Sequence, residues 1–302
     1  MDFVVKSEYD KKTVKEFLRE NIDLSRTALI MLKNKSDGIL VNGSRVTVRY
    51  MLSEGDILSL NYEDADKNFI AENHALLSSL DIIYEDDFIL AVNKPPYMPS
   101  HPSLNHFDDT LANIVMAYFK NNNINSLYRA VNRLDKNTSG IVLIAKDKII
   151  SARLNETMKR GGIRKTYIAV LVGDVNSIYP NGGRIIAPIK REKDSIIKRV
   201  CATDGDYAET RFKILKYSDD LNLSVAEAYP VTGRTHQIRL HFHSIGFPLL
   251  GEDLYCENPQ TTQISRHALH AYSLEFDHPQ SNKKMIIKCE LPDDISSIIN
   301  RI

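Results

Sequence analysis

The order of strand-like and helix-like segments limits most strongly what this chain can fold into. Beyond residue 80, the predicted elements are strands at 82–84, 88–92, 141–145 and 166–172 and helices at 111–118 and 150–158. A doubly wound fold needs a helix after nearly every strand. Here two strands follow each other directly, and from about 172 to 230 short strands alternate with long polar connections. We therefore predict an α+β fold with a mixed, mainly antiparallel sheet.

The first 62 residues predict a small module of their own. The pattern there indicates helices at 12–22 and 25–32, the second capped by Ser25, and strands at 39–41, 45–48 and 57–60. Asn42-Gly43 is a typical two-residue hairpin turn. The segment 63–79 is polar and weakly periodic, so we predict a linker there. The expected organisation is a helix-helix-hairpin domain at 1–62, a linker at 63–79 and a second domain at 80–302.

The overall charge gives no indication of a nucleic-acid partner. Lys plus Arg number 39, and Asp plus Glu also number 39. A nucleic-acid-binding protein with this balance must concentrate its positive charge locally. Residues 153–200 do so, because eleven basic and four acidic residues (11 − 4) give +7. The alternative is an ordinary solvated basic surface.

The cysteines and the lack of targeting patterns indicate the cellular compartment in which the protein is expected. Cys201, Cys256 and Cys289 are widely spaced and form no C-x-x-C pair. This spacing argues against a disulfide framework or a cysteine-based zinc site and fits a reducing environment. The chain has no signal-peptide pattern and no apolar run of about 18 residues. We expect a cytoplasmic protein that does not enter the membrane.

A polar loop at 132–140 is the first candidate for chemistry. It reads Asn-Arg-Leu-Asp-Lys-Asn-Thr-Ser-Gly and lies between apolar segments. Arg133 and Lys136 flank Asp135 and are expected to favour its ionised form, which lowers the pKa of that carboxyl group. An ionised carboxylate suits a nucleophile or an anionic base. The alternative is a salt-bridged turn without a catalytic role.

The second candidate segment runs from Thr232 to His243. Helical phasing places Ile238, Phe242 and Ile245 on one apolar stripe and Thr235, His236, Arg239 and His243 on an adjoining polar face. An arginine on that face could pair with a buried carboxylate and keep it ionised. Gly246 is a suitable end for this helix.

Five histidines raise the question of a metal site. They are His236, His241, His243, His267 and His270. His241 and His243 diverge on a helix, and neither an H-E-x-x-H motif nor a cysteine pair accompanies them. We therefore predict no metal.

The third candidate segment is a strand that begins at Arg164-Lys165-Thr166-Tyr167. It places Tyr167 among basic residues, although an ordinary core tyrosine would fit equally. The chain has no P-loop, no G-x-G-x-x-G and no G-x-S-x-G motif. Nucleotide hydrolysis, dinucleotide redox chemistry and serine-hydrolase chemistry therefore lack their usual signatures, and we predict no cofactor.

Taken together, these segments resemble the RluA-type family of RNA pseudouridine synthases over about 82–292. The shared motifs are Asn93-Lys94-Pro95, R-L-D-x-x-T-S-G at 133–140, K-x-Y at 165–167, G-R-T-H-Q-I-R-x-H at 233–241, Pro248-Leu249-Leu250-Gly251 and His267-Ala268-Leu269-His270-Ala271. Several rare patterns in one order are more specific than any single motif. Residues 1–62 are similar to the S-four-type RNA-binding domain, chiefly in the hairpin signature at 39–43.

The resemblance implies roles for individual residues. The catalytic residues are Asp135 as the catalytic aspartate, Tyr167 as the residue that stacks on the flipped base and helps to manage proton removal, and Arg239 as the basic partner of Asp135. The substrate-binding residues are Arg133 as the side chain that enters the RNA helix, Leu269 as packing against the base, and Arg234 and His236. Arg234 is also the less favoured alternative partner of Asp135. One position departs from the family, because Asn132 stands where a histidine is most frequent.

The resemblance also implies the reaction and its partners. Pseudouridine formation breaks the bond from the uracil nitrogen to ribose and rejoins the base through carbon 5, so no cofactor is needed. The implied partner is RNA, with large-subunit ribosomal RNA favoured over transfer RNA, and we expect a monomer. The route through a covalent adduct or through elimination stays open. Two rival functions are a non-catalytic RNA-binding or ribosome assembly factor on the same fold, and a metal-dependent hydrolase that uses the histidines.

Overall fold

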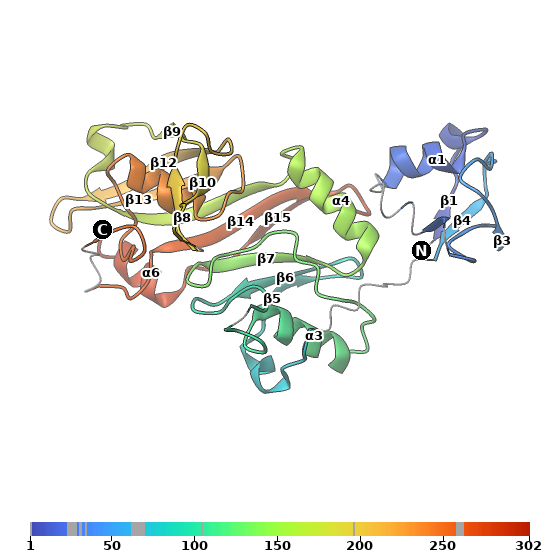
Figure 1. Ribbon diagram of the computed structural model, residues 1–302, viewed down its shortest axis with the longest axis horizontal. Coiled ribbons are helices and arrows are strands. Elements are labelled where there is room, and N and C mark those ends of the chain that lie inside the picture. Colours follow the sequence, from blue (N-terminus) through green and yellow to red (C-terminus); the bar gives the residue numbers. More distant parts are fainter. Residues whose placement is uncertain are drawn as a thin grey trace.

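The computed structural model describes residues 2–22, 29, 32, 33, 35–61, 70–103, 105–195, 197–257 and 263–302. It contains a four-stranded sheet near the N-terminus, a nine-stranded sheet and a two-stranded ribbon (Figure 1). The strands are β1 (Asp2–Val4), β2 (Ile39–Val41), β3 (Ser44–Arg45), β4 (Ile57–Leu60), β5 (Asp81–Glu85), β6 (Ile89–Lys94), β7 (Ser139–Ala145), β8 (Arg164–Val172), β9 (Gly183–Ile186), β10 (Ile189–Arg191), β11 (Arg199–Cys201), β12 (Glu209–Ser218), β13 (Leu223–Pro230), β14 (Leu269–Asp277) and β15 (Lys284–Lys288). The helices are α1 (Val14–Phe17), α3 (Leu111–Asn121), α4 (Lys148–Lys159), α5 (Gln237–Ser244) and α6 (Asp293–Ile299), with short helical turns η1 (Ser7–Tyr9), η2 (Leu18–Ile22), η3 (His74–Ser79) and η4 (Val175–Ser177).

The N-terminal module forms a sheet in the order β1-β4-β2-β3. Helix α1 begins after Thr13, whose side chain and that of Glu16 form a reciprocal capping box. The first predicted helix is present from Val14 to Ile22, although only α1 is an α-helix, because η2 continues it as a π-helix. The return strand predicted at 45–48 is also too long, and strand β1 was not predicted. Of the helix predicted at 25–32, only Leu29 and Leu32 are described, and both are helical.

The large sheet confirms the predicted α+β class. Its strand order is β5-β6-β7-β14-β8-β13-β12-β9, with β15 paired to β14. Every pairing in it is antiparallel except that between β7 and β14. The sheet is therefore mixed and mainly antiparallel, and it includes strands at all four segments predicted after residue 80.

Helices cover both faces of the sheet around β6 and β7. Because side chains alternate along a strand, Ile89 and Ala91 pack in one cluster with Leu154 of α4, whereas Leu90 and Val92 pack in another with α3. All seven residues of β7 are buried, as expected for a strand covered on both faces. Among the described residues, no helix has the length and apolarity needed to cross a bilayer.

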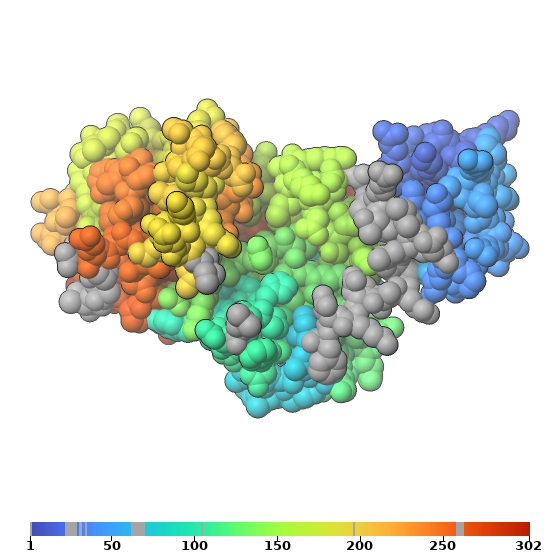
Figure 2. Space-filling view, viewed as in Figure 1, coloured from blue at the N-terminus to red at the C-terminus, as the bar shows by residue number. Residues whose placement is uncertain are grey.

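The segment predicted as a linker is structured where it is described. Residues 62–69 lie outside the described residues, but η3 follows and contacts α3. The amide nitrogen of Asn73 donates to the carbonyl of Asn113, and the Asn113 side chain donates to the carbonyl of Ala71. The N-terminal module forms a separate lobe (Figure 2), although Ile149 of α4 packs into its apolar core.

Candidate active site

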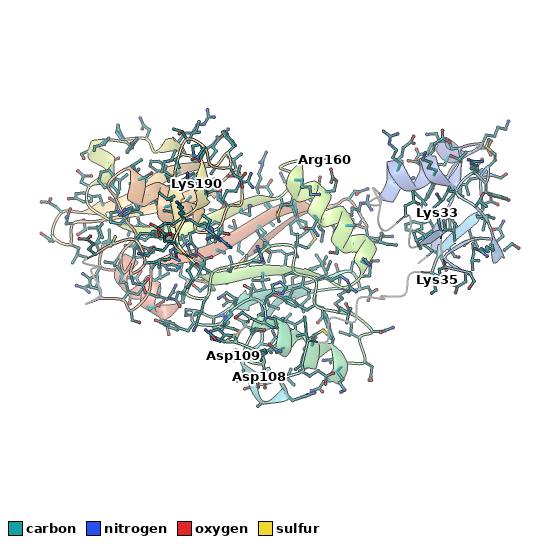
Figure 3. All side chains as sticks on the ribbon, in the orientation of Figure 1. Lys33, Lys35, Asp108, Asp109, Arg160 and Lys190 are labelled. Atoms are coloured by element: carbon teal, nitrogen blue, oxygen red, sulfur yellow. The ribbon has the colours of Figure 1, made fainter. Side chains whose placement is uncertain are left out.

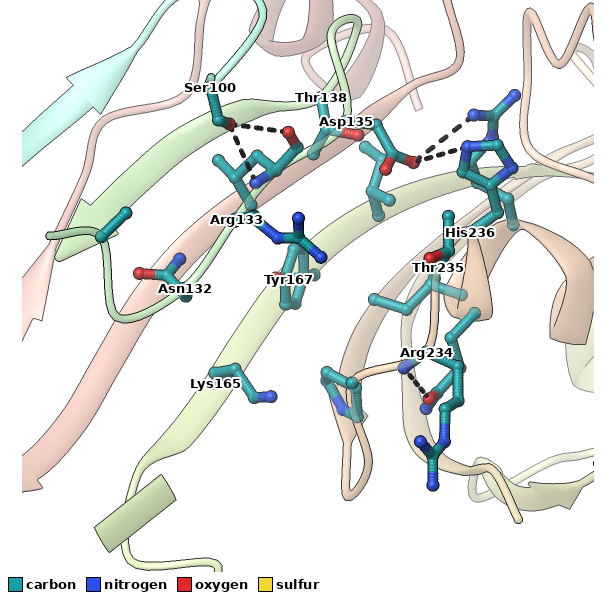
Figure 4. A pocket seen from close by; sticks show the side chains of 18 of the residues that line it. Ser100, Asn132, Arg133, Asp135, Thr138, Lys165, Tyr167, Arg234, Thr235 and His236 are labelled. Atoms are coloured by element: carbon teal, nitrogen blue, oxygen red, sulfur yellow. Dashed lines mark hydrogen bonds and ion pairs between the residues drawn. The ribbon is translucent and has the colours of Figure 1, made fainter. Parts of the chain in front are cut away.

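All seven candidate residues that the sequence predicted lie along the wall of one cleft. The cleft has a volume of about 760 Å³. Asp135, Tyr167, Arg239, Arg133, Leu269, Arg234 and His236 all line it. They come from the loop before β7, from β8, from the turn and helix after β13, and from the start of β14. Segments more than one hundred residues apart in sequence thus meet at this position (Figure 4).

The parallel pairing of β7 with β14 brings the first of these segments together. His270 pairs with Ser139 and Ala271 with Gly140. Gly140 has a φ of +113°, and a Cβ there would lie 2.3 Å from the carbonyl oxygen of Ala271. Only glycine fits so close an approach. This contact places the end of the Asp135 loop beside Leu269.

Side chains from three distant segments hold the backbone of the Asp135 loop. The hydroxyl of Ser100 donates to the carbonyl of Leu134 at 2.8 Å. Lys94 Nζ donates to the carbonyl of Lys136 at 3.1 Å, and Arg266 Nη1 donates to the carbonyl of Asn137 at 3.0 Å. Asp135 therefore sits on a backbone fixed before and after it, which is the preorganisation that a catalytic group requires.

Lys94 is fully buried beneath this loop. Its ammonium also donates to the carbonyls of Pro95 and Met98 at 2.9 and 2.8 Å. Burial lowers the pKa of Lys94 to about 7, against the opposing effect of the negative charge of Asp135. Three carbonyl acceptors match the three donors of a charged ammonium. Lys94 of the N-K-P motif thus supports the Asp135 loop from the interior of the protein.

The carboxylate of Asp135 pairs with Arg239 of α5. Arg239 Nη1 lies 3.4 Å from Asp135 Oδ2, and this guanidinium also binds Glu252 through Nε at 2.8 Å and Nη2 at 2.6 Å. The side chains of Arg239 and Glu252 are 6% and 0% exposed, whereas that of Asp135 is 28% exposed. Glu252 therefore orients the guanidinium, and Asp135 remains open to the cleft.

Arg239, rather than the neighbours of Asp135 in sequence, is thus the cation at the carboxylate. The expectation that Arg133 and Lys136 would act on Asp135 is wrong as to the partners. Lys136 Nζ instead lies 3.2 Å from His106 Nε2. No ion pair joins Arg133 to Asp135 among the described residues. Adjacent side chains in this loop point in different directions, and sequence neighbours are therefore not neighbours in space.

His236 is a second group near the carboxylate. Its Nε2 lies 3.8 Å from Asp135 Oδ2, and its Nδ1 lies 2.6 Å from the hydroxyl of Tyr255. Burial lowers the pKa of His236 below its ordinary value, which favours the neutral ring at neutral pH. The predicted helical phasing of Thr235 and His236 is wrong, because α5 begins at Gln237 and His236 precedes it in the left-handed region with a φ of 58°.

The hydroxyl of Tyr255 is the hydrogen-bond partner of His236 Nδ1. The backbone N–H of Arg199 donates to the Tyr255 hydroxyl at 3.2 Å. Burial raises the pKa of Tyr255 to about 12, so the phenol keeps its proton. A phenol that donates to Nδ1 of a neutral His236 leaves the ring proton on Nε2, the nitrogen that lies 3.8 Å from Asp135 Oδ2.

Tyr167 and Leu269 form the apolar part of the cleft. Tyr167 lies in β8 and Leu269 begins β14, and both pack in the cluster that contains Ile238. Burial and the nearby charge of Asp135 raise the pKa of Tyr167. The phenol is consequently neutral at physiological pH, and it offers an aromatic surface rather than a phenolate base.

Arg133, Arg234 and Asn132 also line the cleft (Figure 4). Arg133 is exposed, and Arg234 Nη1 lies 3.5 Å from Asp206 Oδ2. Arg234 makes no ion pair with Asp135 among the described residues. The amide of Asn132 donates to the carbonyl of Ile141 at 2.9 Å and accepts from the N–H of Leu143 at 2.8 Å. Asn132 is thus bound to the edge of β7.

The other histidines bind groups of the protein itself. His241 bonds to Thr210 and to the carbonyl of Ala187, His267 to Thr138, and His270 to Ser139. Among the described residues, no cluster of three His, Cys, Asp or Glu side chains could hold a metal ion.

Sequence reasoning missed several residues that shape the site: Glu252, Tyr255, Ser100 and Arg266. Glu252 and Tyr255 follow the Pro248–Gly251 turn, and Arg266 precedes His267-Ala268-Leu269-His270-Ala271. Their position beside two of the recognised motifs was the available signal. In this cleft an arginine binds an aspartate beside a buried tyrosine, and further cations line the walls. Such an aspartate can act on the sugar of a nucleotide whose base has left its stack.

Comparison with known proteins identifies the family to which the chain belongs. The family described as RNA pseudouridylate synthase matches residues 88–244. YjbO of Bacillus subtilis, described as an uncharacterized RNA pseudouridine synthase, is 37% identical over 95% of this chain and 98% of its own length. Ribosomal large subunit pseudouridine synthase D of Buchnera aphidicola is 32% identical over 89% of this chain and 82% of its own length.

The solved structures agree on the fold. The structure of human RNA Pseudouridylate Synthase Domain Containing 4 superimposes with a TM-score of 0.60 at 21% identity, over 75% of this chain and 95% of that chain. The family match and the similar relatives identify the same family, and the fold is consistent with it. The chain belongs to the RNA pseudouridine synthases, the isomerases that convert uridine in RNA to pseudouridine.

Proposed function

We propose that this enzyme modifies specific uridines of large-subunit ribosomal RNA. Proteins described as ribosomal large subunit pseudouridine synthase D from Buchnera aphidicola, Neisseria meningitidis and Pseudomonas aeruginosa are 31–32% identical to it over 86–92% of its length. Each is matched over at least three quarters of its own length. Likeness of this extent supports a shared class of substrate.

The chemistry is proposed to depend on Asp135. The bond from uracil N1 to ribose C1′ breaks, the base turns, and C5 bonds to C1′; the proton on C5 leaves and N1 gains one. Asp135 attacks the sugar or removes a ribose proton, and both routes require the ionised carboxylate. The observation that carries this assignment is the 3.4 Å approach of Arg239 Nη1 to Asp135 Oδ2.

The surrounding residues are proposed to receive the extruded nucleotide. Extrusion costs a few kcal/mol, which stacking and filling of the gap can offset. Tyr167 would stack on the base, Leu269 would pack against it, and Arg133 would enter the space that the base has left. Arg234 and His236 complete the substrate-binding set. All five line the same cleft as Asp135.

The N-terminal module is proposed to be a separate RNA-binding domain at 1–62. Figure 3 places Lys33 and Lys35 on this module, Arg160 near the end of α4 and Lys190 near the ribbon of β10 and β11. Cations distributed in this way could contact phosphates of one folded RNA well beyond the cleft. Affinity should then fall steeply as salt rises.

The decisive experiment maps pseudouridine in total RNA from cells with and without the gene. We expect one or a few large-subunit ribosomal uridines to lose the modification in the deletion strain. Wild-type protein should restore it, and Asp135→Asn should not. Loss confined to transfer RNA would overturn the proposed substrate, and restoration by Asp135→Asn would overturn the role of that carboxylate.

A further inference from the structure

Lys165 is a cation on the wall of the active-site cleft, and no group of the described residues pairs with it. Lys165 is the second residue of β8, and it lines the cleft together with Tyr167. Among the described residues its ammonium makes no hydrogen bond and no ion pair. Arg239, in contrast, binds Asp135 and Glu252. An amine that no group of the protein uses is available to a ligand.

The position of Lys165 makes the lack of a counterion energetically unfavourable. Its side chain is half-buried, and burial lowers the pKa of Lys165 below its ordinary value with no anion nearby to oppose the shift. A Cβ built on Gly233 would lie 3.7 Å from Lys165 Nζ, so the ammonium reaches across to the backbone of the turn after β13. Figure 4 shows this direction, toward the loop that carries Arg234. A desolvated charge without a counterion is unfavourable unless a ligand supplies one.

We propose that Lys165 binds a backbone phosphate of the RNA next to the extruded uridine. Lys165 and Tyr167 are two residues apart on one strand, so their side chains leave the same face of the sheet, with Cα atoms roughly 6.6 Å apart. A base stacked on Tyr167 holds its sugar and phosphate within reach of that neighbour. A lysine ammonium serves a phosphate as a compact point charge. The inference rests on the proposed position of the base against Tyr167.

The chain offers a matched control one residue away. Arg164 lies on the same strand but on the opposite face, its side chain is 77% exposed, and its Nη1 lies 3.6 Å from Glu275 Oε1. It does not line the cleft. Arg164→Gln and Lys165→Gln therefore each remove one positive charge from β8, and only the second removes it from the cleft. Lys165→Arg keeps the charge in place.

The test measures tritium release from total RNA labelled with [5-³H]uridine, prepared from a strain that lacks the gene. The apparent KM and kcat are determined for the full chain across a series of KCl concentrations. Because total RNA supplies every target, the result does not depend on whether the modified uridine lies in ribosomal or transfer RNA. Wild-type turnover in this assay verifies the activity independently of Lys165.

For Lys165→Gln we expect an apparent KM about tenfold higher at fixed salt and a kcat at saturation within about twofold of wild type. The slope of log(kcat/KM) against log[KCl] should become shallower by roughly 0.7 to 0.9, which is the loss of one phosphate contact. Lys165→Arg should restore both the slope and KM, and Arg164→Gln should leave the slope unchanged. An unaltered slope in Lys165→Gln, or a fall in kcat with an unaltered KM, would overturn the proposal.

Discussion

Arg239 binds Glu252 through two nitrogens, at 2.8 and 2.6 Å, and so presents its remaining nitrogen to Asp135. Glu252 has no exposed side-chain surface and does not line the cleft, and Arg239 is the cleft-lining residue to which it bonds. A single guanidinium therefore connects Asp135, which faces the cleft, with Glu252, which does not. We expect Glu252 to act as a positioning residue.

Glu252→Gln should lower kcat by roughly 10- to 100-fold, because Arg239 loses the charged, two-point contact that fixes its plane. It should also lower the free energy of unfolding by about 3–5 kcal/mol, since the buried guanidinium of Arg239 loses its charged partner. Steady-state tritium release and urea denaturation measure the two effects. Asp253→Asn is the matched control, because that carboxylate is 57% exposed and 3.9 Å from Arg239. Full turnover by Glu252→Gln would contradict the positioning role.

Asp135→Asn should reduce turnover by at least roughly 10³-fold while RNA affinity stays within a fewfold of wild type. The amide keeps the size of the carboxylate but cannot act as a nucleophile or base. Tritium release measures turnover, and filter binding with labelled total RNA measures affinity. A large loss of affinity in this variant would mean that Asp135 serves binding instead.

Tyr255→Phe should lower kcat by about 3- to 10-fold. The aromatic ring of residue 255, which lies 5.4 Å from the Arg239 guanidinium, remains in this variant. His236 Nδ1 loses its hydroxyl partner, so the imidazole can carry its proton on either nitrogen. The ¹⁵N shifts of His236 report the tautomer directly. If the variant keeps both the Nε2–H form and the wild-type kcat, the hydroxyl has no such function.

The stability of the protein should fall with acidification below about pH 6.5. Burial lowers the pKa of His270 to about 4 and that of His267 well below its ordinary value. Between pH 6.5 and 4 the unfolded chain binds protons that the folded chain excludes, so the free energy of unfolding decreases as pH falls. For His270 alone the loss approaches about 3 kcal/mol at pH 4.

Urea midpoints at pH 7 and pH 5 measure this dependence. His270→Asn is the comparison, because an amide can still bond to Ser139 but does not titrate. Its stability should depend less on pH than that of the wild type. An equal slope in both proteins would show that His270 does not carry the effect.

Removal of the N-terminal module should weaken RNA binding or change site choice more than it impairs chemistry. The truncation should begin at Ile70, because Ala71 and Asn73 bond to the helix α3 segment of the large domain. In the truncated protein Ile149 loses its apolar contacts with the N-terminal module. The truncated protein therefore also carries Ile149→Ser, which keeps the newly exposed surface polar. No turnover on short RNA at saturation would contradict this division of labour.

Local patterns located β5, β6, β7 and β8, because these strands are apolar runs bounded by polar turns. They gave no bounds for β9, β12 and β13, of which β12 and β13 are longer than the short strands expected there, and they did not predict β14 and β15. Patterns did not predict where α5 begins, since the left-handed turn at His236 interrupts a segment whose residues fit a helix throughout. They also missed Glu252, because glutamate is almost always exposed. Its burial depends on Arg239, thirteen residues earlier, and becomes evident only in the folded chain.

The contact between Arg266 and α6 couples the Asp135 loop to a helix outside the cleft. Arg266 binds Asp294 through two nitrogens, at 2.7 and 2.9 Å, and supports the Asp135 loop through the carbonyl of Asn137. The Arg266 side chain has no exposed surface, so this guanidinium transmits strain between the two elements without contact with solvent. A disturbance that displaces α6 should therefore also displace the carboxylate of Asp135, although no residue of that helix lines the cleft.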